Sequence, residues 1–242
     1  MTVPARSVRL LIDEFDFSTD SSGLTLTVAN GVIDAPSFQM TGVERLPGPV
    51  GVSLEHNGYY TGPDVSDLQA ELNDRLGTET PVYVAALFDT RALGNPAYVL
   101  PATWGAQLTL DTPIDKLLTI AGKWAEQYGQ RGYVLLDGAK TATGAGTVVT
   151  LPAAGAAGGV AYLFVRAIDG TAVNADVTVE CDTAANFPSA TTKGTFTFSD
   201  VGVVIITLAG AVEQYVRINV TDLGGADGIT AACIVCVAGV TQ

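Results

Sequence analysis

The chain has 242 residues, of which 48% are hydrophobic and 15% charged, enough apolar material for one large domain or two of ordinary size. Its formal net charge is −13 and both halves are acidic, which argues against tight binding of DNA or RNA, because phosphates need cations. Three cysteines do not make a disulfide framework. With no signal-peptide pattern and no apolar run long enough to span a bilayer, we expect a soluble protein made in a cytoplasm without secretion.

Alternating apolar and polar residues predict strands over 7–12 and 24–29 near the N-terminus. The dipeptide Asn30-Gly31 then predicts a two-residue hairpin, because both central positions of such a turn need a positive φ. Further strand residues follow at 32–33 and 37–41, and alternation resumes over 50–54.

The acidic segment between the first two strands contains Asp13, Asp16 and Asp20 at a spacing that could suggest a calcium site. It lacks the glycine and the terminal glutamate of an EF-hand loop, so a solvated turn is the better interpretation.

A loop and a helix follow the first strands. Pro47 and Pro49 remove backbone donors, so the segment 42–49 cannot belong to a central strand and is expected to be a loop. Over 64–76, apolar residues at spacings of three and four predict a helix that lies on a sheet with one buried face. These residues are Val65, Leu68, Leu72 and Leu76.

The rest of the chain reads as strands in two domains, 1–134 and 135–242, joined by a Gly- and Ala-rich linker over 127–146. After the linker, short strands at regular spacing with no helix between them predict a β-sandwich of immunoglobulin type. The fold class is therefore mainly β. The expected strands are 82–88, 97–100, 103–110 and 117–124 in the first domain, then 147–151, 160–167, 176–180, 194–198, 203–208, 214–220 and 229–237 in the second.

No pattern that carries catalysis or metal binding stands out. His56 is the single histidine, no Gly-x-Ser-x-Gly elbow accompanies it, and a surface or interface position is expected for it. Cys233 and Cys236 have C-x-x-C spacing inside a strand, where residues three apart face opposite sides, so they are expected to be core thiols. We expect no catalytic residue, no cofactor and no metal site, and hence no enzyme.

Two parts of the chain together resemble a protein family. The stretch from Asp34-Ala-Pro-Ser-Phe38 through Leu46-Pro47-Gly48 to Gly58, with the helix DVSDLQAELNDRLG after it, resembles the tail-tube (major tail) proteins of long-tailed bacteriophages. Pro36 departs from that pattern, because the family more often carries a β-branched residue there. The part from AYLFVRAIDG to QYVRINVTDLGG resembles the immunoglobulin-like domains appended to phage structural proteins.

The resemblance implies a tail-tube β-sandwich or barrel domain with one packed helix over 1–134, followed by an immunoglobulin-like domain over 135–242. It implies a virion protein, made in the host cytoplasm, whose hexameric rings stack into a tail tube that conducts DNA without binding it tightly. Expected partners are further copies of the chain, a tape-measure protein and a tail terminator, with no membrane involved. The assembly interface is expected at Ser37, Phe38, Val43, Glu44, Arg45, Leu46, Pro47 and Gly48.

Two other functions stay open. One is a capsid decoration or adaptor protein, which is also structural but needs no tube. The other is a surface glycan-binding module in the C-terminal domain. That domain has no tryptophan, and its tyrosines, Tyr162 and Tyr215, are explained more simply by buried packing.

Overall fold

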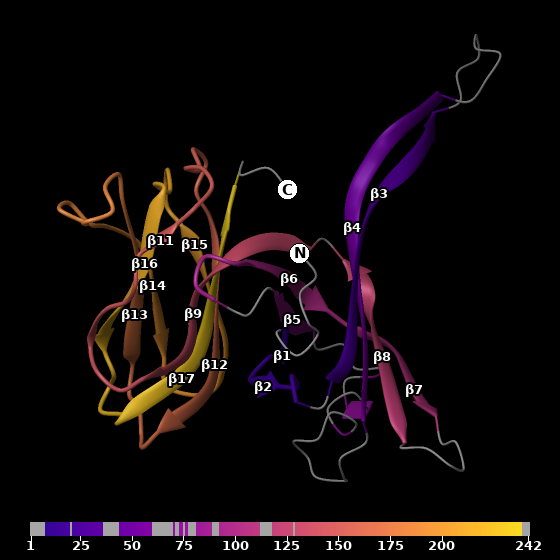
Figure 1. The fold of residues 1–242 in the computed structure, drawn as a ribbon, viewed down its shortest axis with the longest axis horizontal. Coiled ribbons are helices and arrows are strands. Elements are labelled where there is room, and N and C mark those ends of the chain that lie inside the picture. Colours follow the sequence, from indigo (N-terminus) through magenta and orange to yellow (C-terminus); the bar gives the residue numbers. More distant parts are fainter. Residues whose placement is uncertain are drawn as a thin grey trace. The chain divides into compact units, whose positions relative to one another are not determined.

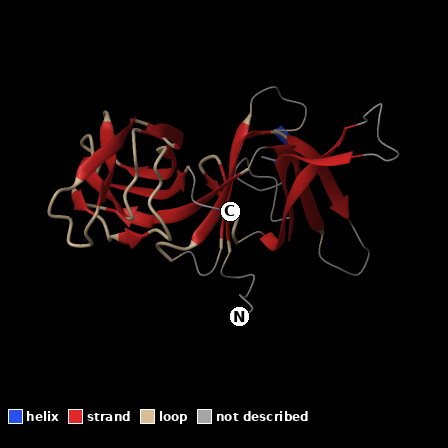
Figure 2. Ribbon diagram, turned by 90° about the horizontal axis from the view of Figure 1, so that it is seen from above, coloured by secondary structure: helices blue, strands red, loops and turns tan. Residues whose placement is uncertain are grey.

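The computed structural model describes residues 8–19, 21–35, 44–59, 70, 73–74, 76, 81–88, 92–111, 118–127 and 129–238, with only the backbone at 30–35, 44–50, 106 and 125–127 (Figure 1). Strands dominate this part of the chain (Figure 2), so the expected mainly β fold is confirmed. The strands are β1 (Arg9–Ile12), β2 (Phe15–Asp16), β3 (Ser21–Ala35), β4 (Glu44–Tyr59), β5 (Val82–Leu87), β6 (Pro96–Thr103), β7 (Gly105–Asp111), β8 (Thr119–Gln127), β9 (Gln130–Lys140), β10 (Gly144–Ala145), β11 (Val149–Thr150), β12 (Gly159–Asp169), β13 (Ala175–Asp182), β14 (Thr191–Phe198), β15 (Gly202–Leu208), β16 (Tyr215–Asp222) and β17 (Gly228–Val237).

Contacts divide the described residues into two compact units. The sandwich unit takes its residues from 1–18, 85–99 and 131–242, and the hairpin unit takes its residues from 19–84 and 100–130. The linker expected over 127–146 is wrong, because most of it is β9, whose residues are buried without a break from Gly132 to Leu136. The division into domains 1–134 and 135–242 stays a prediction, and its boundary falls inside β9.

The sandwich unit contains two antiparallel sheets that enclose one apolar core. The first sheet has the order β15-β12-β17-β9-β6-β5-β1-β2, and the second has the order β10-β16-β13-β14, with β11 also paired to β16. Alternate residues of each strand point into the core, as Val177, Val179 and Cys181 of β13 do. The two-sheet sandwich expected for the C-terminal part of the chain is thus present.

The strand order of this sandwich is that of a jelly roll. From β9 onward the sandwich has eight strands if β10 and β11 are counted as one interrupted strand. The first, third, sixth and eighth of these (β9, β12, β15 and β17) share one sheet, and the other four share the second, as in a jelly roll. An immunoglobulin sandwich would pair the first strand with the second. Here the first strand, β9, is hydrogen-bonded to the last strand, β17. The expected strands are observed, but their order differs from that of the immunoglobulin type.

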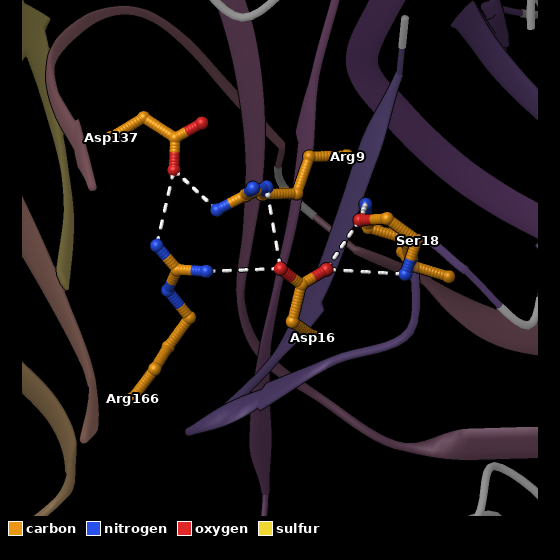
Figure 3. A network of polar contacts seen from close by, with 6 residues as sticks. Arg9, Asp16, Ser18, Asp137 and Arg166 are labelled. Atoms are coloured by element: carbon orange, nitrogen blue, oxygen red, sulfur yellow. Dashed lines mark hydrogen bonds and ion pairs between the residues drawn. The ribbon is translucent and has the colours of Figure 1, made fainter. Parts of the chain in front are cut away.

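The first sheet is strongly curled, and four charged side chains join strands that lie far apart in its order (Figure 3). Asp16 of β2 pairs with Arg166 of β12 at 2.9 Å, although the two strands stand six places apart in the sheet order. In a flat sheet, six strand spacings would separate them by roughly 29 Å. Asp137 of β9 completes the network by accepting from both Arg166, at 3.2 Å, and Arg9 of β1. The curl therefore brings β1 and β2 back against β9 and β12.

The solvated turn expected around Asp16 is wrong. Asp16 lies in β2, where its carboxylate accepts from the backbone N–H of Ser18 at 3.1 Å and from the Ser18 hydroxyl. Arg9 lies 3.3 Å away on the neighbouring strand. Asp16 therefore holds the β1–β2 hairpin to the rest of the sheet and is not available as a calcium ligand.

The hairpin unit contains one antiparallel sheet with the order β3-β4-β8-β7. The tight turn expected at Asn30-Gly31 is wrong, because β3 continues through these residues to Ala35. The pairing register shifts between Asn30 and Val32, so Gly31 lies in a bulge of a much longer hairpin.

The loop expected over 42–49 is wrong from Glu44 onward, because these residues belong to β4. Pairing of β4 with β8 begins only at Val52, so the part of β4 that contains Pro47 and Pro49 has β3 as its single described neighbour. A proline is tolerated at such an edge, since its missing N–H costs no ladder bond on the open side.

Of the helix expected over 64–76, the structure describes helical backbone at Ala70, Asn73 and Asp74, and Leu76 forms an isolated bridge with Gly105. Its other residues lie outside the described part of the chain. The strand expected over 117–124 is confirmed as β8.

The ion-pair network gives a first prediction. Replacing Asp137, whose side chain is 7% exposed, by alanine removes one of the two carboxylates that two mostly buried guanidinium groups share, and leaves Asp16 alone to compensate both. We expect Asp137→Ala to lower the free energy of unfolding by about 3 kcal/mol, measured by urea denaturation. The control is Glu55→Ala, which removes a half-exposed ion pair with Lys123 and is expected to cost less than about 1 kcal/mol. Equal effects of the two substitutions would contradict a structural role for the network.

Candidate assembly surface

The sheet of the hairpin unit has an open edge on each side within the described residues. β3 and β7 stand at opposite ends of the order β3-β4-β8-β7, and each is paired along its length with one strand, while Gly105 at the start of β7 also forms the bridge with Leu76. The unpaired N–H and C=O groups of such an edge are a template for pairing with another chain. β3 offers 15 residues of strand and β7 offers seven.

Apolar side chains are exposed at both edges. Val28 of β3 is 45% exposed and Leu110 of β7 is 48% exposed. In the register of the sheet they lie opposite Val52 and Ile120, which are both buried, so the four side chains share one face. The apolar face thus continues past the core to the exposed side chains of Val28 and Leu110 at the two edges.

The opposite face of the sheet is polar. Lys123 and Glu55 form an ion pair at 2.8 Å at its centre, and Asp111 adds a second carboxylate at the end of β7. The other described side chains of this face, apart from Ala29, Tyr59 and Ala121, are uncharged and polar. They are Thr25, Thr27, Ser53, Asn57, Gln107, Thr109 and Thr119. The face therefore carries one more acidic than basic group among its described side chains.

His56 is a core residue and not the surface or interface residue expected from sequence. It is fully buried on the apolar face, where its ring stacks on Trp124 with 6.4 Å between centroids. The Trp124 indole N–H points at Nδ1 of His56 at 3.4 Å. Gly122 lies opposite His56 on β8, and a Cβ on it would come within 2.5 Å of His56 Cε1. A glycine is required there because the imidazole occupies the space of its side chain.

The environment of His56 keeps it neutral. Burial lowers its pKa from 6.5 to about 4, and its Nε2 atom is buried without a hydrogen-bond partner. No hydroxyl or carboxylate of the described residues is hydrogen-bonded to the ring, so it lacks the neighbours of a nucleophile–base pair. The arrangement places the His56 ring in the packed core of the sheet.

The C-x-x-C cysteines behave as core thiols. Cys233 belongs to the sandwich core and Cys236 points to the other face of β17, as the spacing predicts. Burial raises the pKa of Cys236 to about 12, and burial followed by the neighbouring Cys236 raises that of Cys233 further. Across the described ranges no group of three or more His, Cys, Asp or Glu side chains could hold a metal ion.

None of the helical segments among the described residues has the length and apolar character to cross a bilayer.

The structure describes only some of the residues expected at the assembly interface. Ser37, Phe38 and Val43 lie outside the described residues. The segment 44–48 (Glu44, Arg45, Leu46, Pro47 and Gly48) forms the start of β4, and Glu44–Pro47 pair with residues of β3 between Val32 and Ala35. Sequence reasoning missed Val28 and Leu110. Their alternation was visible, but a sequence pattern does not show that a strand lies at an edge.

Comparisons with known proteins give weak structural similarities. No protein-family model and no curated protein sequence matches the chain. The tube-terminating cap of the anti-feeding prophage is 9% identical over 54% of this chain and 91% of its own, with a TM-score of 0.41. A chain of the sheath-tube complex of the extracellular contractile injection system PVC is 6% identical over 55% and 93%, with a TM-score of 0.42.

The Dit protein of SPP1, described as a hub of the adsorption apparatus in phages that infect Gram-positive hosts, matches over more of the chain. It is 10% identical over 94% of this chain and 98% of its own, with a TM-score of 0.34. All three scores are too low to assign a function.

The burial of His56 predicts a pH-dependent stability. Because the folded pKa is about 4 and the unfolded pKa is 6.5, unfolded chains bind more protons between these values, so stability is lost as the pH falls from 6.5 towards 4. The full loss is about 3 kcal/mol. Urea midpoints of the wild type and His56→Gln, measured from pH 7 to pH 4, test this. Their difference isolates the single histidine, and parallel pH profiles would contradict the prediction.

Proposed function

We propose that this chain is a structural subunit of a phage-like tail whose copies form hexameric rings that stack into a tube. The observation that carries the proposal is the four-stranded sheet with two open edges. If β3 of one copy pairs with β7 of the next, the sheets extend one another around a ring, and closure of the ring removes every edge. The same contact would cover the exposed side chains of Val28 and Leu110.

The polar face of the sheet is the face we assign to the lumen of such a ring. The other face holds the buried side chains of Leu54, Ile120 and Trp124, which the unit's own core already occupies. Lys123 is paired with Glu55, so passing DNA would meet uncharged side chains and no unpaired described cation. This supports passage of DNA without tight binding.

The distal part of the β3–β4 hairpin is the assembly arm of the proposal. Before Val52, β4 has no pairing with β8, so the hairpin continues as a two-stranded ribbon. An isolated two-stranded ribbon is marginally stable in water, which favours its docking on a neighbouring subunit or ring. The residues assigned to this contact are Ser37, Phe38, Val43, Glu44, Arg45, Leu46, Pro47 and Gly48.

The remaining partners follow from the tube. They are a tape-measure protein inside it and a tail terminator at its end, with the virion tail as the location and no enzymatic step. In a capsid decoration or adaptor protein, neither edge of the sheet would be needed for pairing with another copy. The division into a tail-tube domain over 1–134 and an appended domain over 135–242 remains part of the proposal.

Edge pairing is tested by charge at the two edges. Val28→Lys together with Leu110→Lys places a cation on each edge, where edge pairing would have to bury it. We expect a folded protein that stays monomeric in analytical ultracentrifugation and shows no rings in negative-stain images, whereas the wild type forms rings or tubes. The matched control is Val173→Lys, which changes an apolar residue of the sandwich unit that is 64% exposed. This variant should assemble normally. Normal tubes from the double variant would contradict edge pairing.

The assembly arm is tested by shortening the ribbon in register. Ala29 and Gly51 are direct partners, so removing residues 32–50 leaves Asn30-Gly31 as a two-residue turn between them. We expect this variant to keep the wild-type unfolding temperature within a few degrees and to lose stacking of rings into tubes, as seen by electron microscopy. Tubes of normal length would show that the ribbon has no part in assembly.

A further inference from the structure

The outer face of the second sheet of the sandwich unit holds a set of organised polar groups. On the strands β13 and β16, the side chains that point away from the core are polar or aromatic. They are Thr178, Glu180, Asp182, Tyr215, Arg217 and Asn219. Glu180 and Asp182 are nearly inaccessible to solvent although they face away from the core. A buried carboxylate on an outer face is unusual and requires fixed partners.

Arg217 is held in one orientation by two direct contacts, and a third fixes the carboxylate that it pairs with. Its Nε donates to Glu180 Oε2 at 2.8 Å, and Asn219 Nδ2 donates to the other oxygen of the same carboxylate at 2.8 Å. The ring of Phe187 lies over the guanidinium, with 4.2 Å between the ring centroid and Cζ. The plane of the guanidinium is therefore fixed before any ligand arrives.

Several hydrogen-bond donors on this face have no acceptor among the described residues. The Nη nitrogens of Arg217 have no acceptor among the described residues, since its recorded hydrogen bond uses Nε alone. The hydroxyl of Tyr215, two residues earlier on the same face, has no described partner either. These groups can donate hydrogen bonds to a ligand from fixed positions.

The loop that carries Phe187 has a strained backbone and is held in place by hydrogen bonds. Phe187 has a φ of 50°, a left-handed conformation that is rare for a bulky side chain. The carboxylate of Asp182 fixes the loop by accepting from the N–H groups of Ala184 at 3.0 Å and Ser189 at 2.8 Å. Burial alone would raise the pKa of Asp182, but these N–H groups, with Thr183, outweigh it and lower the pKa. The loop therefore keeps the aromatic ring over Arg217.

We propose that this face, formed by Phe187, Tyr215, Arg217 and Asn219, binds a neutral saccharide. Sugar hydroxyls accept hydrogen bonds from fixed N–H donors, and the C–H face of a sugar ring packs on an aromatic side chain. The charge of Arg217 is already compensated by Glu180, and the chain carries a net charge of −13, so an anionic ligand is disfavoured. Jelly rolls include lectin domains, which makes the fold compatible with this use. The inference is independent of tube assembly.

The experiment is saturation-transfer NMR on the full chain with methyl glycosides of glucose, galactose and N-acetylglucosamine at millimolar concentration. Phe187→Gly removes the ring while giving the strained position a residue that adopts positive φ readily, so the loop is expected to fold. Arg217→Lys keeps the charge but loses the planar pair of Nη donors. The control is Asn174→Gly, which relieves the same backbone conformation, φ 55°, at an exposed residue elsewhere in the unit.

We expect at least one glycoside to bind, with affinity reduced about tenfold or more in Phe187→Gly and Arg217→Lys and unchanged in Asn174→Gly. Absence of binding by all three glycosides would overturn the proposal, as would binding that both variants leave unchanged. Glucuronic acid and inorganic phosphate serve as anionic probes. Tighter binding of either than of the neutral sugars would assign Arg217 to an anion and also overturn the saccharide proposal.

Discussion

The curl of the long sheet in the sandwich unit depends on one ion-pair network. Arg9 and Asp16 lie on the first two strands, Asp137 on β9 and Arg166 on β12. On the side of the sheet away from the sandwich core, Phe164 is also fully buried. Charges are costly to bury, so such a network stabilises only when every member is paired, and it specifies one arrangement of strands over others.

The same principle applies to the titratable groups of the described interior. Buried titratable groups are either paired, as Asp137 is, or held neutral, as His56 and Cys233 are. The functions proposed for this molecule use surfaces instead, namely the edges of one sheet and the outer face of another.

The strands were largely predictable from sequence, and their pairing was not. Regular spacing of short apolar runs correctly placed the strands after residue 147, including β12 and β17, which are buried on both faces over much of their length. Strand order depends on contacts between distant segments, so the jelly-roll order could not be derived from alternation. The apolar run in β9 was mistaken for part of a linker, because a strand buried on both faces loses its alternation. The exposed edge residues were missed for a related reason, since an edge exists only in the assembled sheet.

The position of β17 has a consequence for how the chain folds during synthesis. β17 is the last strand in sequence, yet it lies between β12 and β9 in the middle of the long sheet and is paired on both sides. The ribosome must therefore deliver the chain through Val237 before the sandwich can be completed, and the facing edges of β9 and β12 stay unpaired until then. Such pairing between distant segments makes folding slow, and during this delay the nascent chain is exposed to aggregation.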